Sequence, residues 1–343
     1  MRHWTIGLLY SFNAATSLAC LNRHRWWLIS AGMDVLHCTR SSMKSLLLGL
    51  DSVCGGSLLV SLLGLIPLLV LIGYFMLLER KVMSGIHKRR GPDLNGLSGI
   101  IQTIYDGLKL VLKVLVGVKS SHWLMYIIAV GMAVSSTLGL WGLLVVGSRS
   151  GLVVEGFEVD EGYGVLGLLG LSSFSVLGVF LAGWCSNNKY SLLGGLRGLA
   201  QLVAYDICFG MVVLTMLLFT NSLWLSAFVD TQRYSWHMYS AWPLGMVYCI
   251  VALAESHRSP FDLPEAESEL ISGFNTEYSS VCLALFFIAE YSAMLAVGSL
   301  GVVFFFGGFD GQWQWAVVLV GVWYIWVRAT LPRYSYDQLL YVC

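Results

Sequence analysis

The stretch SSVCLALFFIAEYSAMLAVGSLGVVFFF, residues 279–306, decides the fold of this chain. It is an apolar run with a single charged residue, Glu290. Because about 20 predominantly apolar residues suffice for a helix to cross the hydrocarbon core of a bilayer, the run predicts a transmembrane helix. An ionisable group inside such a helix is costly, so Glu290 marks a candidate functional site.

The composition of the whole chain agrees with that run. Hydrophobic residues make up 57% and charged residues 12% of the 343 positions, and the mean hydropathy is +0.73. Since a soluble globular domain would carry about 25% charged residues, the chain is predicted to be an all-α polytopic membrane protein with interfacial amphipathic helices. We expect about seven transmembrane helices, near residues 53–78, 124–147, 163–184, 199–220, 241–257, 279–306 and 312–328.

The basic residues of the connections orient these predicted spans. Thirteen lie on the side of the loops 79–123, 185–198 and 258–278, and only Arg149 and Arg233 lie on the opposite side. Basic residues accumulate on the cytoplasmic or matrix side of a membrane protein, so we expect the three large loops there. The zero formal net charge gives no reason to expect a nucleic-acid partner.

The N-terminal 52 residues differ from the predicted transmembrane domain, residues 53–343. They carry five basic residues and no acidic residue before Asp34, a pattern typical of a mitochondrial presequence. The apolar part, Thr5 to Cys20, is short for a span, so we expect an extension that lies on the membrane surface or against a neighbour. If no span precedes residue 53, the basic residues of this extension lie on the side of the membrane opposite the three basic loops.

Two features of the sequence, a G-x-G-x-x-G match and the cysteines, could suggest cofactor sites but are better explained otherwise. The residues Gly162-Tyr163-Gly164-Val165-Leu166-Gly167 match G-x-G-x-x-G, but they open an apolar span instead of joining a strand to a helix, so close helix packing is the preferred interpretation. The eight cysteines are far apart, and none forms a Cys-x-x-Cys pair. We therefore predict no metal or iron–sulfur site on this chain.

Apolar residues recur at helical spacing from Ser98 to residue 115, with Asp106 and Lys109 on the polar side. The segment is shorter than a span, so we expect it to lie in the membrane interface, either as a plain anchor or as part of a site.

Acidic residues gather around the fifth and sixth predicted spans. Glu255, Asp262, Glu265, Glu267, Glu269 and Glu277 precede Glu290, and Asp206 lies about two turns inside the fourth predicted span. Neighbouring carboxyl groups raise one another's pKa and couple their titrations, which favours proton transfer near neutral pH. A solvated acidic loop would explain the exposed members, and a basic partner would explain Asp206, but neither accounts for Glu290.

Several motifs resemble one family, chain 1 of NADH:ubiquinone oxidoreductase (respiratory complex I), over about residues 55 to 340. They are Glu79-Arg80-Lys81, Arg90-Gly91-Pro92, Asp106-Gly107-x-Lys109-Leu110, Ala182-Gly183-Trp184-Cys185-Ser186-Asn187, Leu196-Arg197-x-x-Ala200-Gln201, Ala254-Glu255-x-x-Arg258-x-Pro260-Phe261-Asp262-Leu263, Glu267-x-Glu269-Leu270-x-Ser272-Gly273-Phe274-Asn275-x-Glu277-Tyr278, Ala289-Glu290-Tyr291 and Arg328-x-x-x-Pro332-Arg333-Tyr334-x-Tyr336-Asp337-Gln338.

The resemblance implies a multi-pass subunit of the mitochondrial inner membrane that forms the ubiquinone access tunnel and the first acidic residues coupling quinone reduction to proton translocation. Ubiquinone would be the substrate, whereas NADH, flavin, metal and iron–sulfur clusters would belong to other subunits, and no catalytic residue is expected on this chain. The expected partners are the hydrophilic quinone-site subunits, the neighbouring membrane-arm subunits and lipids. The resemblance assigns to the quinone path Arg80, Asp106, Phe274 and Arg328, to the proton relay Asp206, Glu255, Glu265, Glu267, Glu269, Glu277 and Glu290, and to structural or electrostatic roles Glu79, Arg197, Arg258 and Asp262.

The chain departs from the family pattern at a few positions. His87 replaces a glutamine, Val114 replaces a glutamate, and Asp206 stands where a glutamate is common. The family usually continues through an eighth span beyond the Tyr-Asp-Gln block, so we expect a separate chain, lipid or accessory subunit in its place. Two alternatives remain, a stand-alone ion transporter and the membrane anchor of a related hydrogenase-type complex.

Overall fold

A computed structural model describes residues 57–96, 99–115, 122–147, 164–233, 235–264, 271–308 and 314–342. The chain forms two compact units, Met1–Val60 and Ser61–Cys343, and the described residues belong to the second unit except for residues 57–60. Within the described ranges every regular element is a helix, which confirms the predicted all-α class. The predicted N-terminal extension, residues 1–52, lies outside them.

All seven predicted apolar segments contain a helix. These are α3 (Ser57–Ile86), α5 (Trp123–Gly147), α6 (Gly164–Cys185), α7 (Lys189–Thr220), α10 (Trp242–Glu255), α12 (Ser280–Phe305) and α13 (Gln314–Thr330). Within the part of the chain that the structure describes, four helices are long and apolar enough to cross a membrane, namely α5, α6, α7 and α12. The shorter helices α10 and α13 are also apolar, which fits a multi-pass membrane protein.

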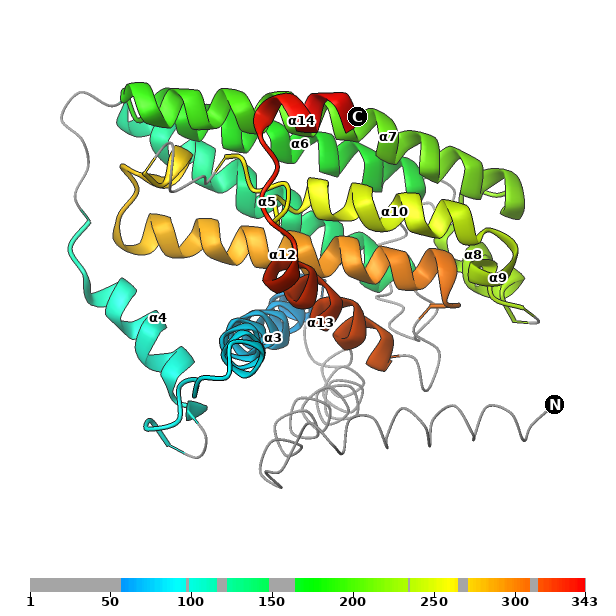
Figure 1. Cartoon of the computed structure of the whole chain (residues 1–343), viewed down its shortest axis with the longest axis horizontal. Coiled ribbons are helices and arrows are strands. Elements are labelled where there is room, and N and C mark those ends of the chain that lie inside the picture. Colours follow the sequence, from blue (N-terminus) through cyan, green and yellow to red (C-terminus); the bar gives the residue numbers. More distant parts are fainter. Residues whose placement is uncertain are drawn as a thin grey trace. The chain divides into compact units, whose positions relative to one another are not determined.

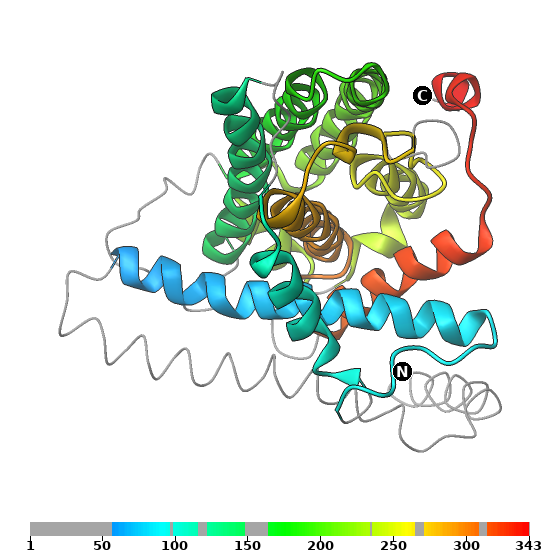
Figure 2. The same cartoon turned by 90° about the vertical axis from the view of Figure 1, so that its left-hand side faces the viewer.

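The second unit is built around α12. Helices α5, α6, α7, α10 and α12 run side by side (Figure 1), with α5 against α6, α6 against α7, and α10 between α7 and α12. Helix α3 crosses the direction of α12 steeply, since α12 is seen nearly end-on where α3 lies across the view (Figure 2). The ring of Phe75 in α3 meets Tyr291 of α12 edge-on at 6.3 Å. These contacts bring the C-terminal half of α3 close to the middle of α12.

Glycines let the helices approach closely. A Cβ atom at Gly183 of α6 would lie 2.9 Å from the Cα atom of Gly195 in α7, so no larger residue fits at this crossing. A Cβ atom at Gly167 would lie 2.9 Å from Leu143 of α5. Gly167 of the glycine-rich pattern thus faces a neighbouring helix, as small residues commonly do in membrane helices.

The prediction that residues 185–198 form a loop is wrong, because α7 begins at Lys189. The Asn188 side chain caps this helix by accepting a hydrogen bond of 3.2 Å from the backbone N–H of Tyr190. The glycines of this stretch have close neighbours: a Cβ atom at Gly194 would lie 2.8 Å from the backbone nitrogen of Phe274. Asp206 is 17 residues after Lys189, which is about five turns into the helix instead of two.

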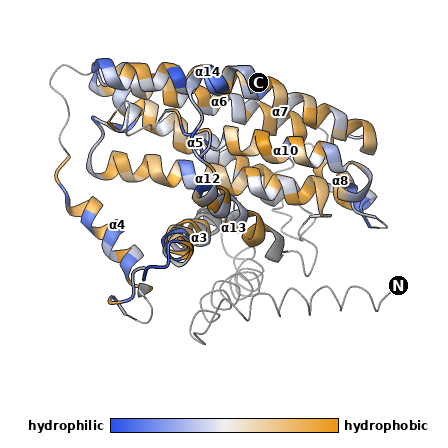
Figure 3. Ribbon diagram, viewed as in Figure 1, coloured by the Kyte–Doolittle hydropathy of each residue, from blue (hydrophilic) through white to orange (hydrophobic). Residues whose placement is uncertain are grey.

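The expected loop 79–123 is also partly helical. Helix α3 continues to Ile86, and a separate helix, α4 (Gln102–Leu112), follows the hydrophilic segment after α3 (Figure 3). No residue of α4 is buried, and Ile104, Leu108 and Val111 are exposed apolar side chains. The predicted amphipathic helix is therefore present.

Helix α4 is attached to the start of α12. The Ser280 hydroxyl donates to the carbonyl oxygens of Leu110, at 3.1 Å, and of Lys113. Short elements complete the described residues: α8 (Leu225–Thr231), α9 (His237–Ser240), the 3-10 helix η3 (Gly273–Asn275) and α14 (Tyr336–Val342).

Candidate functional site

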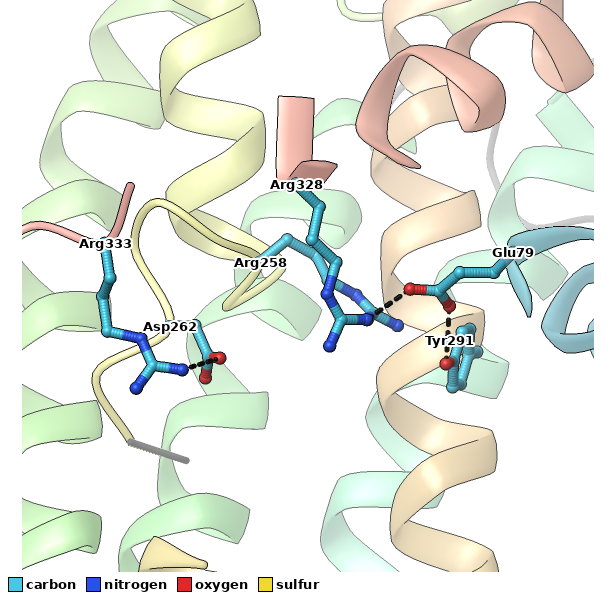
Figure 4. Close-up of polar contacts among 6 residues, drawn as sticks. All are labelled: Glu79, Arg258, Asp262, Tyr291, Arg328 and Arg333. Carbon is cyan, nitrogen blue, oxygen red and sulfur yellow. Dashed lines mark hydrogen bonds and ion pairs between the residues drawn. The ribbon is translucent and has the colours of Figure 1, made fainter. Parts of the chain in front are cut away.

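A buried carboxylate joins three segments that are distant in the sequence. Glu79 of α3 accepts a hydrogen bond of 3.2 Å at Oε1 from Arg258, which follows α10, and it also pairs with Arg328 of α13 (Figure 4). The Tyr291 hydroxyl of α12 donates a hydrogen bond of 2.6 Å to Oε2 of Glu79. We call Glu79, Arg258, Tyr291 and Arg328 the arginine–glutamate centre.

Arg258 keeps its charge inside the protein. Its guanidinium lies 4.4 Å from the centre of the Tyr291 ring, a distance suited to a cation–π contact. Burial disfavours the charged form, but Glu290 and Glu79 outweigh burial and raise the pKa of Arg258 above its ordinary value. Two guanidinium groups share one carboxylate, so removal of Glu79 would leave a buried cation without its ion pair.

Asp262 forms a second ion pair in the loop that follows α10. Its Oδ2 accepts a hydrogen bond of 2.8 Å from Arg333 (Figure 4). The Asp262 residue is 8% exposed, and burial raises the pKa of its carboxyl group although Arg333 and Arg328 act in the opposite direction. Arg258 and Asp262, which were predicted to have structural or electrostatic roles, each form an ion pair.

Gln201 fixes the same loop, although the family motifs had suggested no role for its side chain. It is fully buried in α7, and its Nε2 donates hydrogen bonds of 2.9 Å to the carbonyl oxygens of both Ala254 and Phe261. One side chain thus satisfies two backbone groups on either side of Arg258. The signal available in the sequence was a polar amide inside an apolar helix, since such groups need hydrogen-bond partners.

A cavity lies beside this loop. Among the residues that line it are Phe274 and two predicted relay acids, Glu255 at the end of α10 and Glu290 in α12. His257 also lines it, and burial lowers the pKa of this imidazole to about 4. Asp206 interacts electrostatically with Glu255 and lies 3.4 Å from the Ser172 hydroxyl. The structure therefore brings three of the relay candidates into one region.

Other predicted residues occupy separate positions. Arg80 and Asp106 pair at 2.6 Å between α3 and α4, where both side chains are partly exposed. Glu277 accepts a hydrogen bond of 2.7 Å from Asn188, and the Arg197 guanidinium lies 5.9 Å from the centre of the Tyr336 ring. The candidates Glu265, Glu267 and Glu269 lie outside the described residues.

In chemical terms, the carboxyl groups and arginines of the site can hold charge and exchange protons. Among the described residues, no cluster of three or more His, Cys, Asp or Glu side chains has the geometry of a metal site. Carboxyl groups beside a cavity and next to paired arginines instead suit electrostatic coupling and proton exchange.

Comparison with known proteins shows which family the chain belongs to. The sequence model of the family described as NADH dehydrogenase matches residues 59–343. NADH-ubiquinone oxidoreductase chain 1 of Dictyostelium citrinum is 42% identical over 287 residues, covering 83% of this chain and 87% of that protein. An NADH-quinone oxidoreductase subunit of Rickettsia canadensis (strain McKiel) is 40% identical over 291 residues, covering 80% and 84%.

The chain 1 protein of Chondrus crispus is 38% identical over 299 residues, covering 83% of this chain and 90% of that protein. The family match extends over most of the chain, including the arginine–glutamate centre and the cavity. The chain therefore belongs to the NADH dehydrogenase family, whose members include chain 1 of NADH-ubiquinone oxidoreductase.

Proposed function

We propose that this chain is the membrane-arm subunit of a proton-translocating NADH:ubiquinone oxidoreductase, in which it borders the ubiquinone access tunnel and couples quinone reduction to proton movement. The relatives named above are subunits of NADH-quinone oxidoreductases, and this supports the assignment. The mitochondrial inner membrane is the proposed location, and the other subunits of the complex are the proposed partners.

The observation that carries the coupling role is the pair Glu255 and Glu290 at one cavity, next to the arginine–glutamate centre. Reduction of a quinone to a quinol consumes two electrons and two protons, so it changes the charge near the quinone head group. Buried carboxyl groups respond to such a change by taking up or releasing protons, because low local polarity strengthens electrostatic interactions. Protonation would then bias the loop after α10 and helix α12, and pass energy to neighbouring membrane subunits.

For the quinone path we propose Arg80, Asp106, Phe274 and Arg328. Arg328 belongs to the arginine–glutamate centre, and Phe274 lines the cavity with Glu255. The remaining proposed relay residues are Asp206, Glu277 and the acids at 265, 267 and 269. Electrons would enter through flavin and iron–sulfur clusters on partner subunits, and this chain would supply shape and electrostatics.

Two substitutions test the coupling role in the assembled enzyme. Glu255→Gln and Glu290→Gln keep the size of the side chains and remove their charge. We expect both variants to lower ubiquinone-linked turnover while NADH oxidation by an artificial acceptor is unchanged. Wild-type quinone turnover in both variants would contradict the assignment.

A photoreactive quinone analogue tests the tunnel. Labelling of this chain that excess ubiquinone suppresses is the expected result. A chain that only anchored a complex, or that transported ions on its own, would not be labelled.

A further inference from the structure

The cavity beside Glu255 and Glu290 has a third polar group, the imidazole of His257. Glu255 is the last residue of α10, His257 lies in the turn that follows, and Glu290 belongs to α12. The cavity offers about 60 Å³ to the centres of water molecules. One water molecule needs about 10–15 Å³ of such space, so more than one water molecule fits.

Two buried polar atoms at this cavity lack a hydrogen-bond partner among the described residues. They are Oε2 of Glu255 and Nδ1 of His257. Glu255 is 8% exposed, so bulk solvent does not satisfy its carboxyl group. An unsatisfied buried polar atom is costly, and a shared water molecule removes that cost.

The backbone holds His257 in a defined position. Its φ angle is +50°, a left-handed conformation that ends α10. The backbone N–H of His257 donates a hydrogen bond of 3.3 Å to the carbonyl oxygen of Ala254, the same oxygen that accepts from Gln201. His257 therefore lies in a turn that is also held by the hydrogen bond from Gln201 of α7.

The groups around the imidazole come from several elements. Glu255 and Glu290 face the cavity, and Asp206 of α7 interacts electrostatically with Glu255. The charged neighbours of Glu290 include Arg258, Asp262, Glu79 and Arg328. Ser256, Thr137 of α5 and Ser175 of α6 complete the polar lining. A neutral imidazole accepts a hydrogen bond at the nitrogen that carries no proton, and burial favours this form.

We propose that His257 is a positioning residue whose imidazole Nδ1 holds a water molecule between the carboxyl groups of Glu255 and Glu290. The carboxyl group of Glu255 transfers its proton to this water, and the water passes one of its own protons to the carboxylate of Glu290. Glu255 becomes a carboxylate, Glu290 becomes neutral, and the water and the imidazole are unchanged. The inference rests on the relay role proposed above, and it adds the group that orients the transfer.

Three variants of the assembled enzyme separate this role from a structural one. His257→Asn keeps a hydrogen-bond acceptor and tolerates a positive φ angle. His257→Gly fits the backbone but has no acceptor. His257→Leu has no acceptor and strains the turn. The measurements are ubiquinone-linked turnover, its solvent deuterium isotope effect, and NADH oxidation by an artificial acceptor.

We expect His257→Asn to retain turnover and the wild-type isotope effect. His257→Gly should lower quinone-linked turnover by about tenfold and raise the isotope effect, because a poorly oriented proton transfer becomes rate-limiting. His257→Leu should lose at least as much turnover as His257→Gly. Oxidation by the artificial acceptor should be unchanged in all three.

Wild-type turnover and isotope effect in an assembled His257→Gly enzyme would overturn the inference, as would equal losses in the Asn and Gly variants. Failure of the Gly variant to assemble would also overturn it, since it would show that the residue is needed for folding. If Glu255→Gln and Glu290→Gln both leave quinone turnover unchanged, the proposed function itself fails. If they lower it and the histidine variants behave like wild type, only the role of His257 is lost.

Discussion

The Tyr291 hydroxyl donates a hydrogen bond of 2.6 Å to the Oε2 atom of Glu79, although 212 residues separate the two positions in the sequence. The bond joins α3 to the middle of α12. Since Tyr291 directly follows Glu290, it also places a proposed relay acid next to the arginine–glutamate centre.

Replacement of Tyr291 by Phe tests this bond. The ring that faces Arg258 would remain, but the Glu79 oxygen would lose a buried donor, at a cost of about 1–3 kcal/mol. We expect the isolated complex to inactivate at a lower temperature, which a thermal inactivation series can measure. An unchanged inactivation temperature would mean that water or another group replaces the hydroxyl.

Glu79→Gln should have a larger effect on stability. The Glu79 and Arg258 side chains are 7% and 8% exposed, so loss of the carboxylate leaves a buried guanidinium unpaired, at roughly 3–5 kcal/mol. We expect little assembled complex on a native gel. The matched control is Asp106→Asn: the Arg80–Asp106 pair is 49% and 36% exposed, and exposed pairs contribute only about 0–1 kcal/mol. Equal assembly of the two variants would contradict the buried-pair argument.

Gln201→Leu should loosen the loop after α10. The leucine fills a similar volume but leaves the carbonyl oxygens of Ala254 and Phe261 without their 2.9 Å bonds, which together contribute about 2 kcal/mol. We expect faster hydrogen exchange across residues 256–264 and a lower inactivation temperature. Val203→Ala changes an exposed side chain on the same helix and should change neither measurement. Unchanged exchange in Gln201→Leu would show that the loop is held by other contacts.

His257 predicts a sensitivity to acid. A histidine in the unfolded chain titrates near pH 6.5, whereas the pKa of buried His257 is about 4. Between these values the unfolded chain binds a proton that the folded chain does not, so stability falls as the pH drops from 6.5 towards 4. His257→Asn removes this contribution.

The fall in inactivation temperature between about pH 7.5 and about pH 5 should therefore be smaller in His257→Asn than in the wild type. At pH values well above the pKa of an unfolded histidine, the titration of His257 contributes no difference in stability between the wild type and His257→Asn. An equal fall in both proteins would show that the imidazole is not held neutral.

The transmembrane segments could be predicted from the sequence because the signal is local. A run such as residues 279–306 is apolar over its own length, and the seven predicted segments all contain helices. The start of α7 was missed because the prediction rested on the apolar run 199–220, whereas Gly194 and Gly195, which precede that run, let the backbone approach η3 and α6. The close packing of these glycines depends on residues that are distant in the sequence, so no local sequence pattern predicts it.

In the candidate site too, some residues could be predicted from the sequence and others could not. Acids such as Glu255 and Glu290 stood out because charge is rare in apolar runs, and the family motifs assigned them a role. The partners of Glu79 could not be predicted, since Glu79 is 179 residues from Arg258 and 249 residues from Arg328. Gln201 and the cavity depend on how α7, α10 and α12 pack, and they became visible only in three dimensions.

The attachment of α4 to Ser280 has a mechanical consequence. Ser280 starts α12, and Glu290 and Tyr291 lie on the same continuous helix, about three turns further along. A continuous helix transmits displacement along its axis with little bending over so short a length. A displacement of α4 would therefore also displace α12, which carries the buried acid Glu290 and Tyr291, the hydrogen-bond donor to Glu79. No hinge in α12 separates Ser280 from these two residues.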